Sequence, residues 1–327
     1  MSDEFSLIER HLRRPAGRSD VLLAGGDDAA LVAVPADSLL VVTTDMLVAG
    51  VHFEAEAPAA AVGHKALAVN LSDLAAMGAA PAWVSLALTL PAPASEDWLA
   101  DFAEGFYALA DAAGVALIGG DLTQGPLSLC VQALGLLPAA AGALRREGAN
   151  VGDLVCVTGT LGDAALALAC SLGGAKTPAD ADAAFLQQRL QQPWPRLGAG
   201  VALRPLASAG IDVSDGLIAD LGHICRASGV GAIIEQAQLP LSAAARATAG
   251  AAGLDVLEAA LYGGDDYELC VTVPPAALAA AQRAVAASEF LGLTPIGRIV
   301  AEPGIRLQAA DGGLHAPRPQ VGYRHFG

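Results

Sequence analysis

The segment AAVGHKALAVNLSDLAAMGAAPAWVSLALTL, residues 60–90, indicates the fold class of the chain. Its first part, residues 60–78, has the pattern of an apolar helix with a few polar points. Its last part, residues 82–90, alternates serine and threonine with apolar neighbours and predicts a half-buried strand. Residues 74–95 carry no charge, but glycine and prolines interrupt them. A helix followed by a strand therefore fits this region better than a membrane span.

Strand and helix patterns continue to alternate along the chain. Its 327 residues are enough for two domains, and small residues, a basic pair and glycines interrupt the pattern at 137–153. We predict a two-domain α/β (α+β) fold divided into residues 1–140 and 141–327. Strands are expected at 29–34, 39–45, 115–121, 127–137, 153–159, 209–215, 231–236, 267–273 and 294–300, and helices at 95–114, 160–173 (with Thr160 as its cap), 215–229 and 275–288.

The composition limits the classes of partner. Hydrophobic residues make up 54% of the chain and the formal net charge is −16. A chain this acidic lacks the basic footprint that duplex nucleic acid or an anionic membrane surface requires, so we expect neither as a partner. The first residues, MSDEFSLIERHL, have acids where a signal peptide has basic residues, and the five cysteines are far apart. We expect a cytoplasmic protein with reduced, mostly buried thiols.

Acidic residues recur at the ends of apolar runs. For any single loop, the simplest explanation is that aspartate favours turns and helix N-termini. Several of these acids follow strands directly, however, and α/β proteins tend to place their sites at strand ends. Six segments share this design: Asp27 and Asp28 after two glycines, Asp45 after VVTT, Asp73 in VNLSD, Asp121 after IGG, Asp212 and Asp215 around Ser214, and Asp265 with Asp266 after YGG.

Convergence of even three or four of these acids would require a cation. Two like charges about 4 Å apart cost on the order of 4 kcal/mol at an effective dielectric of about 20. Carboxylate, hydroxyl and carbonyl oxygens, with no Cys or His spacing nearby, favour Mg²⁺. Because Mg²⁺ is commonly bound through carboxylates and substrate phosphates together, the pattern predicts a polyphosphate ligand, with backbone donors from the glycine loops.

Three polar residues interrupt the helix predicted around residues 62–77: Lys65, Asn70 and Asp73. Asn70 and Asp73 share one face of that helix. Two explanations remain open: a satisfied internal hydrogen-bond network, or Asp73 reaching metal ions while Asn70 or Lys65 orients a phosphate. Similarly, His52 and Tyr323 either pack for stability or contact an aromatic or cationic ligand.

Taken together, the motifs resemble those of the thiamine-monophosphate kinase family, in the superfamily of ATP-dependent enzymes that includes aminoimidazole ribonucleotide synthetase. The resemblance runs nearly end to end. One departure is Asp265, where the family usually has glutamate. The motifs are FSLIERHL, GGDDAAL, TTDMLVAGVHF, KALAVNLSDLAAMGAAP, IGGDLTQGPLS, VTGTLGDAALAL, IDVSDGLIADLGHI, GGDDYELC and GYRHF.

The resemblance implies a fold, a reaction and a set of contacts. The fold would have N-terminal strands pairing across a homodimer, a C-terminal α/β sandwich, and the active site between the domains. ATP and thiamine monophosphate would give ADP and thiamine diphosphate by direct in-line transfer with several Mg²⁺ ions and no covalent or general-base residue. The implied metal ligands are Asp28, Thr43, Thr44, Asp45, Asp73, Asp121, Asp212 and Asp215, with Asp27 added; Gly120, Asp121, Arg146 and Ser214 would contact ATP, and His52, Asp265 and Tyr323 the thiamine phosphate.

Two rival functions remain open. The first is a related ATP-dependent enzyme with another substrate. Selenophosphate synthetases usually need an N-terminal cysteine or selenocysteine, whereas the first cysteine here is Cys130, and hydrogenase-maturation dehydratases end in a cysteine, whereas no cysteine follows Cys270. The second is a catalytically silent nucleotide-binding protein, which would bind Mg–ATP without turnover.

Overall fold

The computed structural model describes residues 4–173, 180–289 and 291–319. The chain forms two compact units, each described by itself. Unit 1 consists of Met1–Leu74 and Ala79–Gly142, and unit 2 of Ala75–Gly78 and Ala143–Gly327. Within the described ranges, no helix has both the length and the apolar character needed to cross a membrane.

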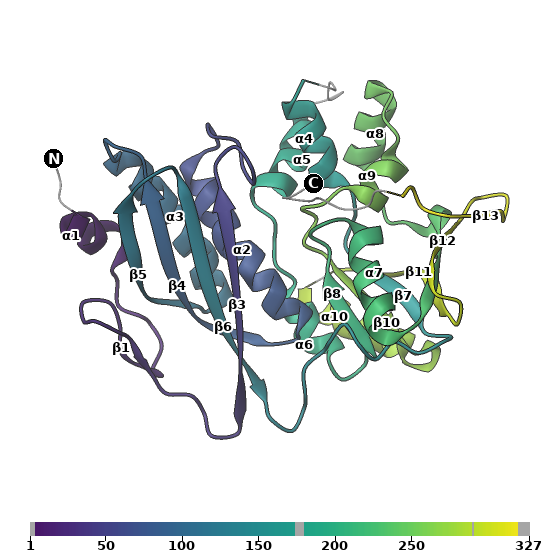
Figure 1. Ribbon diagram of the computed structural model, residues 1–327, viewed down its shortest axis with the longest axis horizontal. Helices are drawn as coiled ribbons and strands as arrows, with labels where there is room; N and C mark the ends of the chain where they lie inside the picture. The colour runs from purple at the N-terminus through teal and green to yellow at the C-terminus, as the bar shows by residue number, and fades with distance from the viewer. Residues whose placement is uncertain (1–3, 174–179, 290, 320–327) are drawn as a thin grey trace. The chain divides into compact units, whose positions relative to one another are not determined.

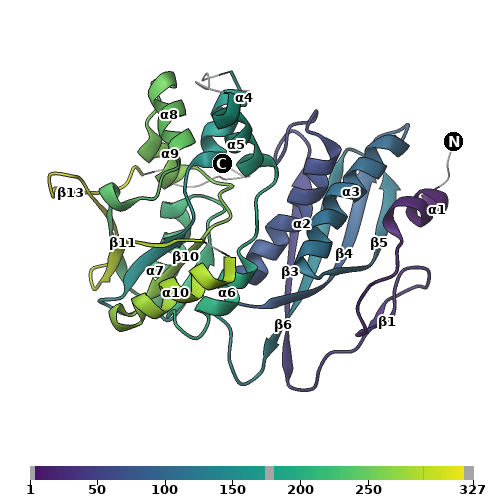
Figure 2. The same ribbon diagram turned by 180° about the vertical axis from the view of Figure 1, so that it is seen from behind.

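Unit 1 is built on a four-stranded sheet with two helices on one face (Figures 1 and 2). Strand β4 continues through helix α3 into a parallel β5, and the other neighbours are antiparallel. The sheet order is β3 (Ser38–Val48), β6 (Ser128–Pro138), β4 (Ala80–Leu90) and β5 (Ala116–Gln124); the helices are α2 (Ala59–Ala76) and α3 (Glu96–Ala113), and α1 (Glu4–Leu7), the π-helical turn η1 (Ile8–Leu12), β1 (Val21–Leu23) and β2 (Leu31–Val32) precede them.

Unit 2 contains a seven-stranded mixed sheet in which β9 and β12 are parallel. Its strands are, in sheet order, β13 (Leu314–His315), β12 (Gly304–Gln308), β9 (Gly231–Glu235), β11 (Leu293–Val300), β7 (Leu154–Thr158), β10 (Leu269–Val273) and β8 (Ala209–Asp212). Its helices are α4 (Asp163–Ser171), α5 (Asp180–Gln191), α6 (Leu197–Leu203), α7 (Leu217–Ser228), α8 (Ala243–Ala252), α9 (Val256–Tyr262) and α10 (Leu278–Glu289), with short 3₁₀ turns η2 (Gln236–Gln238) and η3 (Pro275–Ala277).

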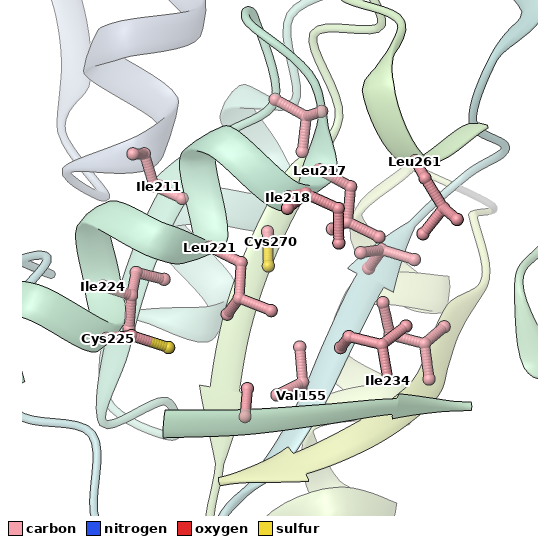
Figure 3. Close-up of a cluster of buried hydrophobic side chains, with 14 of the residues drawn as sticks. Val155, Ile211, Leu217, Ile218, Leu221, Ile224, Cys225, Ile234, Leu261 and Cys270 are labelled. Atoms are coloured by element: carbon pink, nitrogen blue, oxygen red, sulfur yellow. The ribbon is translucent and has the colours of Figure 1, made fainter. Parts of the chain in front are cut away.

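The core of unit 2 explains why its central strands are apolar throughout. Helix α7 buries Leu217, Leu221 and Ile224, spaced as one helical face, against the sheet, where Cys270 of β10 lies (Figure 3). The next residue of β10, Val271, belongs to a second buried cluster. Because successive strand residues point to opposite faces, this sheet is covered on both sides, and a continuous apolar run is the result.

Two sequence-based predictions are corrected by the structure. The strand predicted at 29–34 is reduced to Leu31–Val32. Thr160 does not cap helix α4, because its hydroxyl donates to the Asp163 side chain (Oγ1 to Oδ2, 2.5 Å). The N-cap position belongs to Gly162, whose left-handed backbone has a φ of 84°.

Helices α2 and α3 approach each other closely through a pair of buried glycines. A Cβ atom built on Gly63 would lie 2.1 Å from the carbonyl oxygen of Phe102, and one on Gly105 would lie 1.8 Å from that of Ala60. Real Cβ atoms do not come this close to backbone oxygens. Glycine at both positions is therefore what lets α2 lie against α3 and brings the polar residues of α2 to the sheet.

The substitution Gly105→Ala should destabilise unit 1 by about 3 kcal/mol, because the clash is with backbone and cannot be relieved by a rotamer change. Gly250→Ala is the matched control, since Gly250 is also helical but has no atom within 4 Å of the added carbon. That control should raise stability by about 0.5–1 kcal/mol through helix propensity. Urea denaturation measures both; equal effects of the two variants would contradict the close approach of α2 and α3.

Candidate active site

The first group of polar residues joins strand β3 to helix α2 within unit 1. Alternation along β3 turns Thr43 and Asp45 toward α2 and leaves Thr44 exposed on the other face. The Thr43 hydroxyl donates to Oδ2 of Asp73. The backbone N–H of Asp45 donates to Oδ1 of Asn70 over 2.9 Å. We call Thr43, Asp45, Asn70 and Asp73 the β3–α2 group.

Electrostatics within the β3–α2 group favour a cation. Burial, and then the negative charge of Asp73, raise the pKa of Asp45 to about 6. Both effects disfavour the charged carboxylate, and a bound cation would reverse the second of them. The available donors are carboxylate and hydroxyl oxygens, which is the chemistry that Mg²⁺ prefers.

The structure decides between the two explanations for Asn70. Its side chain is fully buried, and Nδ2 donates to the carbonyl oxygen of Ala66 over 3.0 Å while Oδ1 accepts from Asp45. Asn70 is therefore part of a satisfied internal network that ties α2 to β3. Lys65 is also buried, and its contact with a phosphate stays a prediction.

The second group lies at the other edge of the same sheet. The backbone N–H of Gly25 donates to the carbonyl oxygen of Ile118 (3.1 Å), so the loop with Asp27 and Asp28 runs beside β5, which contains Gly120 and Asp121. Both loop aspartates are exposed, and the Asp27 side chain accepts from the Asp28 amide over 2.9 Å. We call Asp27, Asp28, Gly120 and Asp121 the β5-edge group.

The packing of β5 against β4 is by itself enough to require a glycine at position 120. A Cβ there would lie 1.8 Å from the carbonyl oxygen of Leu86 on the neighbouring strand β4. Sequence reasoning assigned this glycine to nucleotide contact only.

His52, outside both groups, accepts a hydrogen bond at Nδ1 from the backbone N–H of Val48 (3.0 Å), which fixes its ring beside the end of β3.

The two groups of unit 1 are well separated. Strand β3 forms one edge of the sheet and β5 the other, with β6 and β4 between them. Three strand spacings of about 4.8 Å place the two edges about 14 Å apart. Within one copy of unit 1, Asp45 and Asp121 are therefore too far apart to hold the same ion, whose ligands lie about 2.1 Å from it.

In unit 2, Asp212 is the last residue of β8, and the loop after it contains Ser214 and Asp215. Oδ2 of Asp220, in the first turn of α7, accepts from the backbone N–H groups of Ser214 and Asp215, both at 3.0 Å. Burial, followed by the charges of Asp212 and Asp215, raises the pKa of Asp220 to about 8. Sequence reasoning missed Asp220; its place five residues after Asp215, inside the first helical turn, was the available signal.

Arg146 lies in an exposed loop, and Ser228 at the C-terminal end of helix α7 holds this loop by hydrogen bonds. The Ser228 hydroxyl donates to the carbonyl oxygen of Arg146 and accepts from the N–H of Gly148. The pKa of His223 is lowered by burial and then by the guanidiniums of Arg226 and Arg146, while Asp215 opposes them. Arg146 and Asp215 thus act on the pKa of His223 in opposite directions.

The GGDDYEL segment, residues 263–269, runs beside this loop. The N–H of Asp265 donates to the carbonyl oxygen of Ser214 and that of Tyr267 to Val213, both over 2.9 Å. The Tyr267 hydroxyl donates to Oδ1 of Asp265, also over 2.9 Å. Asp265 and Tyr267 have φ angles of 64° and 49°, a left-handed conformation that is rare for residues other than glycine.

The two other acids of the segment point into the protein. Both oxygens of Asp266 accept from the N–H of Gly162 at 3.0 Å, and burial raises its pKa well above the ordinary value. Glu268 is fully buried and accepts from Arg189, Arg196 and Thr158. Burial alone would raise the pKa of Glu268, but Arg196 and then Arg189 hold it below its ordinary value. Sequence analysis assigned none of these residues a role apart from noting Asp266.

Among the residues that the structure describes, no three His, Cys, Asp or Glu side chains form a ready-made metal site. Within unit 1 the predicted residues fall mainly into two groups, the β3–α2 group and the β5-edge group. Within unit 2 they lie at the end of β8 and in loops: Arg146, Asp212, Ser214, Asp215 and Asp265. Tyr323 lies outside the described residues. The ligand roles of all these residues stay predictions.

Comparison with known proteins now adds the family. Family models of the AIR synthase related protein match residues 26–137 (N-terminal domain) and 150–310 (C-terminal domain). A thiamine-monophosphate kinase of Salmonella typhimurium is 49% identical over 272 residues, covering 83% of this chain and 82% of the relative. The chain belongs to the thiamine-monophosphate kinase family.

Solved structures of the thiamine-monophosphate kinase family share the fold. The enzyme from Stenotrophomonas maltophilia K279a has a TM-score of 0.86 and 50% identity, over 95% of this chain and 98% of that one. The structure of AaThiL complexed with AMPPCP and TMP has a TM-score of 0.79 and 31% identity, over 98% and 96% of the two chains. The predicted two-domain fold of mixed helices and sheets is thereby confirmed.

Removal of the Asn70 side chain should destabilise the protein even without nucleotide or metal. Asn70→Ala leaves the partly buried N–H of Asp45 without its acceptor, so the free energy of unfolding should fall by about 1–3 kcal/mol. Asn150→Ala is the matched control, because Asn150 is exposed and its side chain donates to the carbonyl oxygen of Gly148; its cost should be about 0.5 kcal/mol. Stability unchanged in Asn70→Ala would instead favour the phosphate-contact explanation.

Proposed function

We propose that this protein transfers the γ-phosphoryl group of ATP to thiamine monophosphate, giving thiamine diphosphate and ADP. This is the last step of thiamine diphosphate biosynthesis. The observation that carries the proposal is the 49% identity, over most of both chains, to a protein named thiamine-monophosphate kinase. The family's AaThiL structure, complexed with AMPPCP and TMP, supports the same pair of substrates.

The oxygen-rich donor set fits several Mg²⁺ ions as the metal requirement. In the β3–α2 group, Asp45 and Asp73 are close enough for one charge to raise the pKa of the other acid. Bound Mg²⁺ would neutralise this repulsion and spread the charge of the nucleotide phosphates. The proposed ligands are Asp28, Thr43, Thr44, Asp45, Asp73, Asp121, Asp212, Asp215 and Asp27.

The reaction needs positioning more than proton transfer. A phosphate monoester has a second pKa of about 6, so the acceptor oxygen is already anionic at neutral pH and needs no general base. The task of the protein is to hold two anionic phosphates in line. Gly120, Asp121, Arg146 and Ser214 are the proposed nucleotide contacts, and His52, Asp265 and Tyr323 the proposed contacts of thiamine monophosphate.

We further propose that the active form is a homodimer in which residues 1–140 bind ATP and Mg²⁺ and pair between subunits, while residues 141–327 complete the active site. The separation of the two groups in unit 1 supports this. One copy holds Asp45 and Asp121 at opposite edges of its sheet, about 14 Å apart. A second copy can place its β3–α2 group beside the β5-edge group of the first.

An exposed apolar face supports the same assembly. Leu40, Val42 and Met46 alternate along β3 on the face opposite α2, and they are 42%, 53% and 59% exposed. A second copy of the chain would cover these side chains and remove their apolar surface from water.

We also propose a cytoplasmic location, which the absence of disulfides among the five cysteines supports.

The direct experiment mixes purified protein with Mg–ATP and thiamine monophosphate and follows thiamine diphosphate by chromatography. We expect product that depends on magnesium. Binding of Mg–ATP without product would redirect the search to other acceptor substrates or to a non-catalytic role. Absence of both binding and product would contradict the proposal as a whole.

The variant Asp73→Asn should keep its fold while turnover falls by about 10²–10³-fold, because an amide lacks the charge that holds a cation but still accepts from Thr43. The control is Asp101→Asn, an exposed acid on α3, which should leave turnover unchanged. Product formation and thermal unfolding are measured for both. Near-normal turnover in Asp73→Asn would remove Asp73 from the metal ligands. The same comparison ranks the loop acids: Asp28→Asn should cost more than Asp27→Asn.

The variant Val42→Glu should convert the dimer to monomer and abolish most turnover, because the assembled interface would have to bury a charge. Leu172→Glu is the matched control: Leu172 is 75% exposed at the end of α4 in unit 2. Sedimentation velocity gives the mass and the kinase assay gives the activity. A fully active monomeric wild type would rule out the shared site.

A further inference from the structure

The GGDDYEL segment has an unfavourable backbone conformation that contacts with the rest of unit 2 hold in place. Two of its residues, Asp265 and Tyr267, are left-handed, and neither is a glycine or an asparagine. Such residues persist only where the surrounding structure over-determines them. On one side, their N–H groups donate to the carbonyl oxygens of Ser214 and Val213. The restraint on the other side comes from a side chain far away in the sequence.

That side chain is Arg189, from helix α5. Its Nη2 atom donates to Oε1 of Glu268 (2.9 Å) and to the carbonyl oxygen of Asp266 (3.3 Å). The carbonyl of Asp266 lies between the two left-handed residues, so Arg189 binds the strained backbone directly. The guanidinium is largely buried, and Nε also lies 3.5 Å from the Asp163 carboxylate. A largely buried, forked cation with several fixed acceptors has little freedom to move.

A second arginine provides a natural comparison. Arg196 donates to both oxygens of the same Glu268, from Nε over 2.7 Å and from Nη2 over 2.5 Å. It is as buried as Arg189, and its side chain also approaches Glu289. No hydrogen bond joins Arg196 to the backbone of residues 265–267 among the contacts described. The two arginines therefore share the ion pair and differ in the contact with the Asp266 carbonyl.

We propose that Arg189 is a positioning residue that holds residues 265–267 in the conformation that presents Asp265 to the cationic phosphate acceptor. The inference rests on the proposed function, which assigns Asp265 to that acceptor. Arg189 touches neither substrate. It acts through the Asp266 carbonyl, and the Tyr267 hydroxyl bonded to Oδ1 of Asp265 fixes the direction of the carboxylate. The segment thereby contributes to acceptor recognition and not to nucleotide binding.

The test compares Arg189→Lys with Arg196→Lys in the full-length protein. Lysine keeps the positive charge beside Glu268. Its single ammonium group cannot reproduce the guanidinium geometry in which Nη2 donates to both Glu268 and the Asp266 carbonyl while Nε lies near Asp163. In Arg189→Lys, KM for thiamine monophosphate should rise about tenfold while KM for ATP changes less than about twofold. In Arg196→Lys, both constants should stay within about twofold, although stability falls. Equal shifts in the two variants, or an equal rise in KM for ATP, would overturn the proposal.

Backbone hydrogen exchange supplies a readout that needs no substrate. The amide protons of Asp265 and Tyr267 should exchange at least about tenfold faster in Arg189→Lys than in Arg196→Lys, relative to wild type. Unchanged exchange at these amides in Arg189→Lys would overturn the proposal whatever the kinetics show. If the wild type makes no thiamine diphosphate while the Arg189-specific exchange is present, the proposed function fails and the restraint by Arg189 stands.

Discussion

Repulsion between carboxylates is the constraint on which this structure depends. A chain with a formal charge of −16 places Asp45 and Asp73 close together beneath one strand, and burial and their mutual charge raise the pKa of Asp45 to about 6. Two such charges are costly in a partly buried site. A neutral donor offsets part of that cost, because the Thr43 hydroxyl donates to Asp73. Asn70 accepts from the backbone N–H of Asp45 and so fixes the backbone beside that acid. The repulsion that is left would be relieved by a bound cation.

Unit 2 handles its buried acids in a different way. Two guanidiniums and a threonine hydroxyl compensate Glu268, so that its pKa stays low despite complete burial. Asp220 accepts from the N–H groups of Ser214 and Asp215, and its pKa is raised to about 8 by burial and by its acidic neighbours. A fixed ion network suits a structural role, because it leaves no uncompensated charge. An acid whose pKa is raised by neighbouring acids is typical of a ligand-binding or catalytic site.

Much of the fold could be predicted from the chain, because the core elements are periodic. The helix at 60–78 and the strand at 82–90 have their counterparts in α2 and β4. The strand predicted at 29–34 shrank to two residues, since an apolar run alone does not provide a neighbouring strand. Of the site, the acids could be found as a group by their recurrence after strands. Their separation at the two sheet edges could not, because it depends on the strand order, which local patterns do not encode.

Two residues that sequence reasoning missed, Asp220 and Arg189, act on the backbone of other residues, as the predicted Asn70 also does. Asp220 accepts from two amides of the β8 loop, Asn70 from the amide of Asp45, and Arg189 donates to the carbonyl of Asp266. Each lies far from its target in sequence or belongs to a common pattern such as a helix terminus. For the proposed transfer this division of labour is expected, because two anionic phosphates need their contacts held still before any charge moves. The acids can be found from the sequence pattern, whereas the residues that fix their backbone determine where the carboxylates lie.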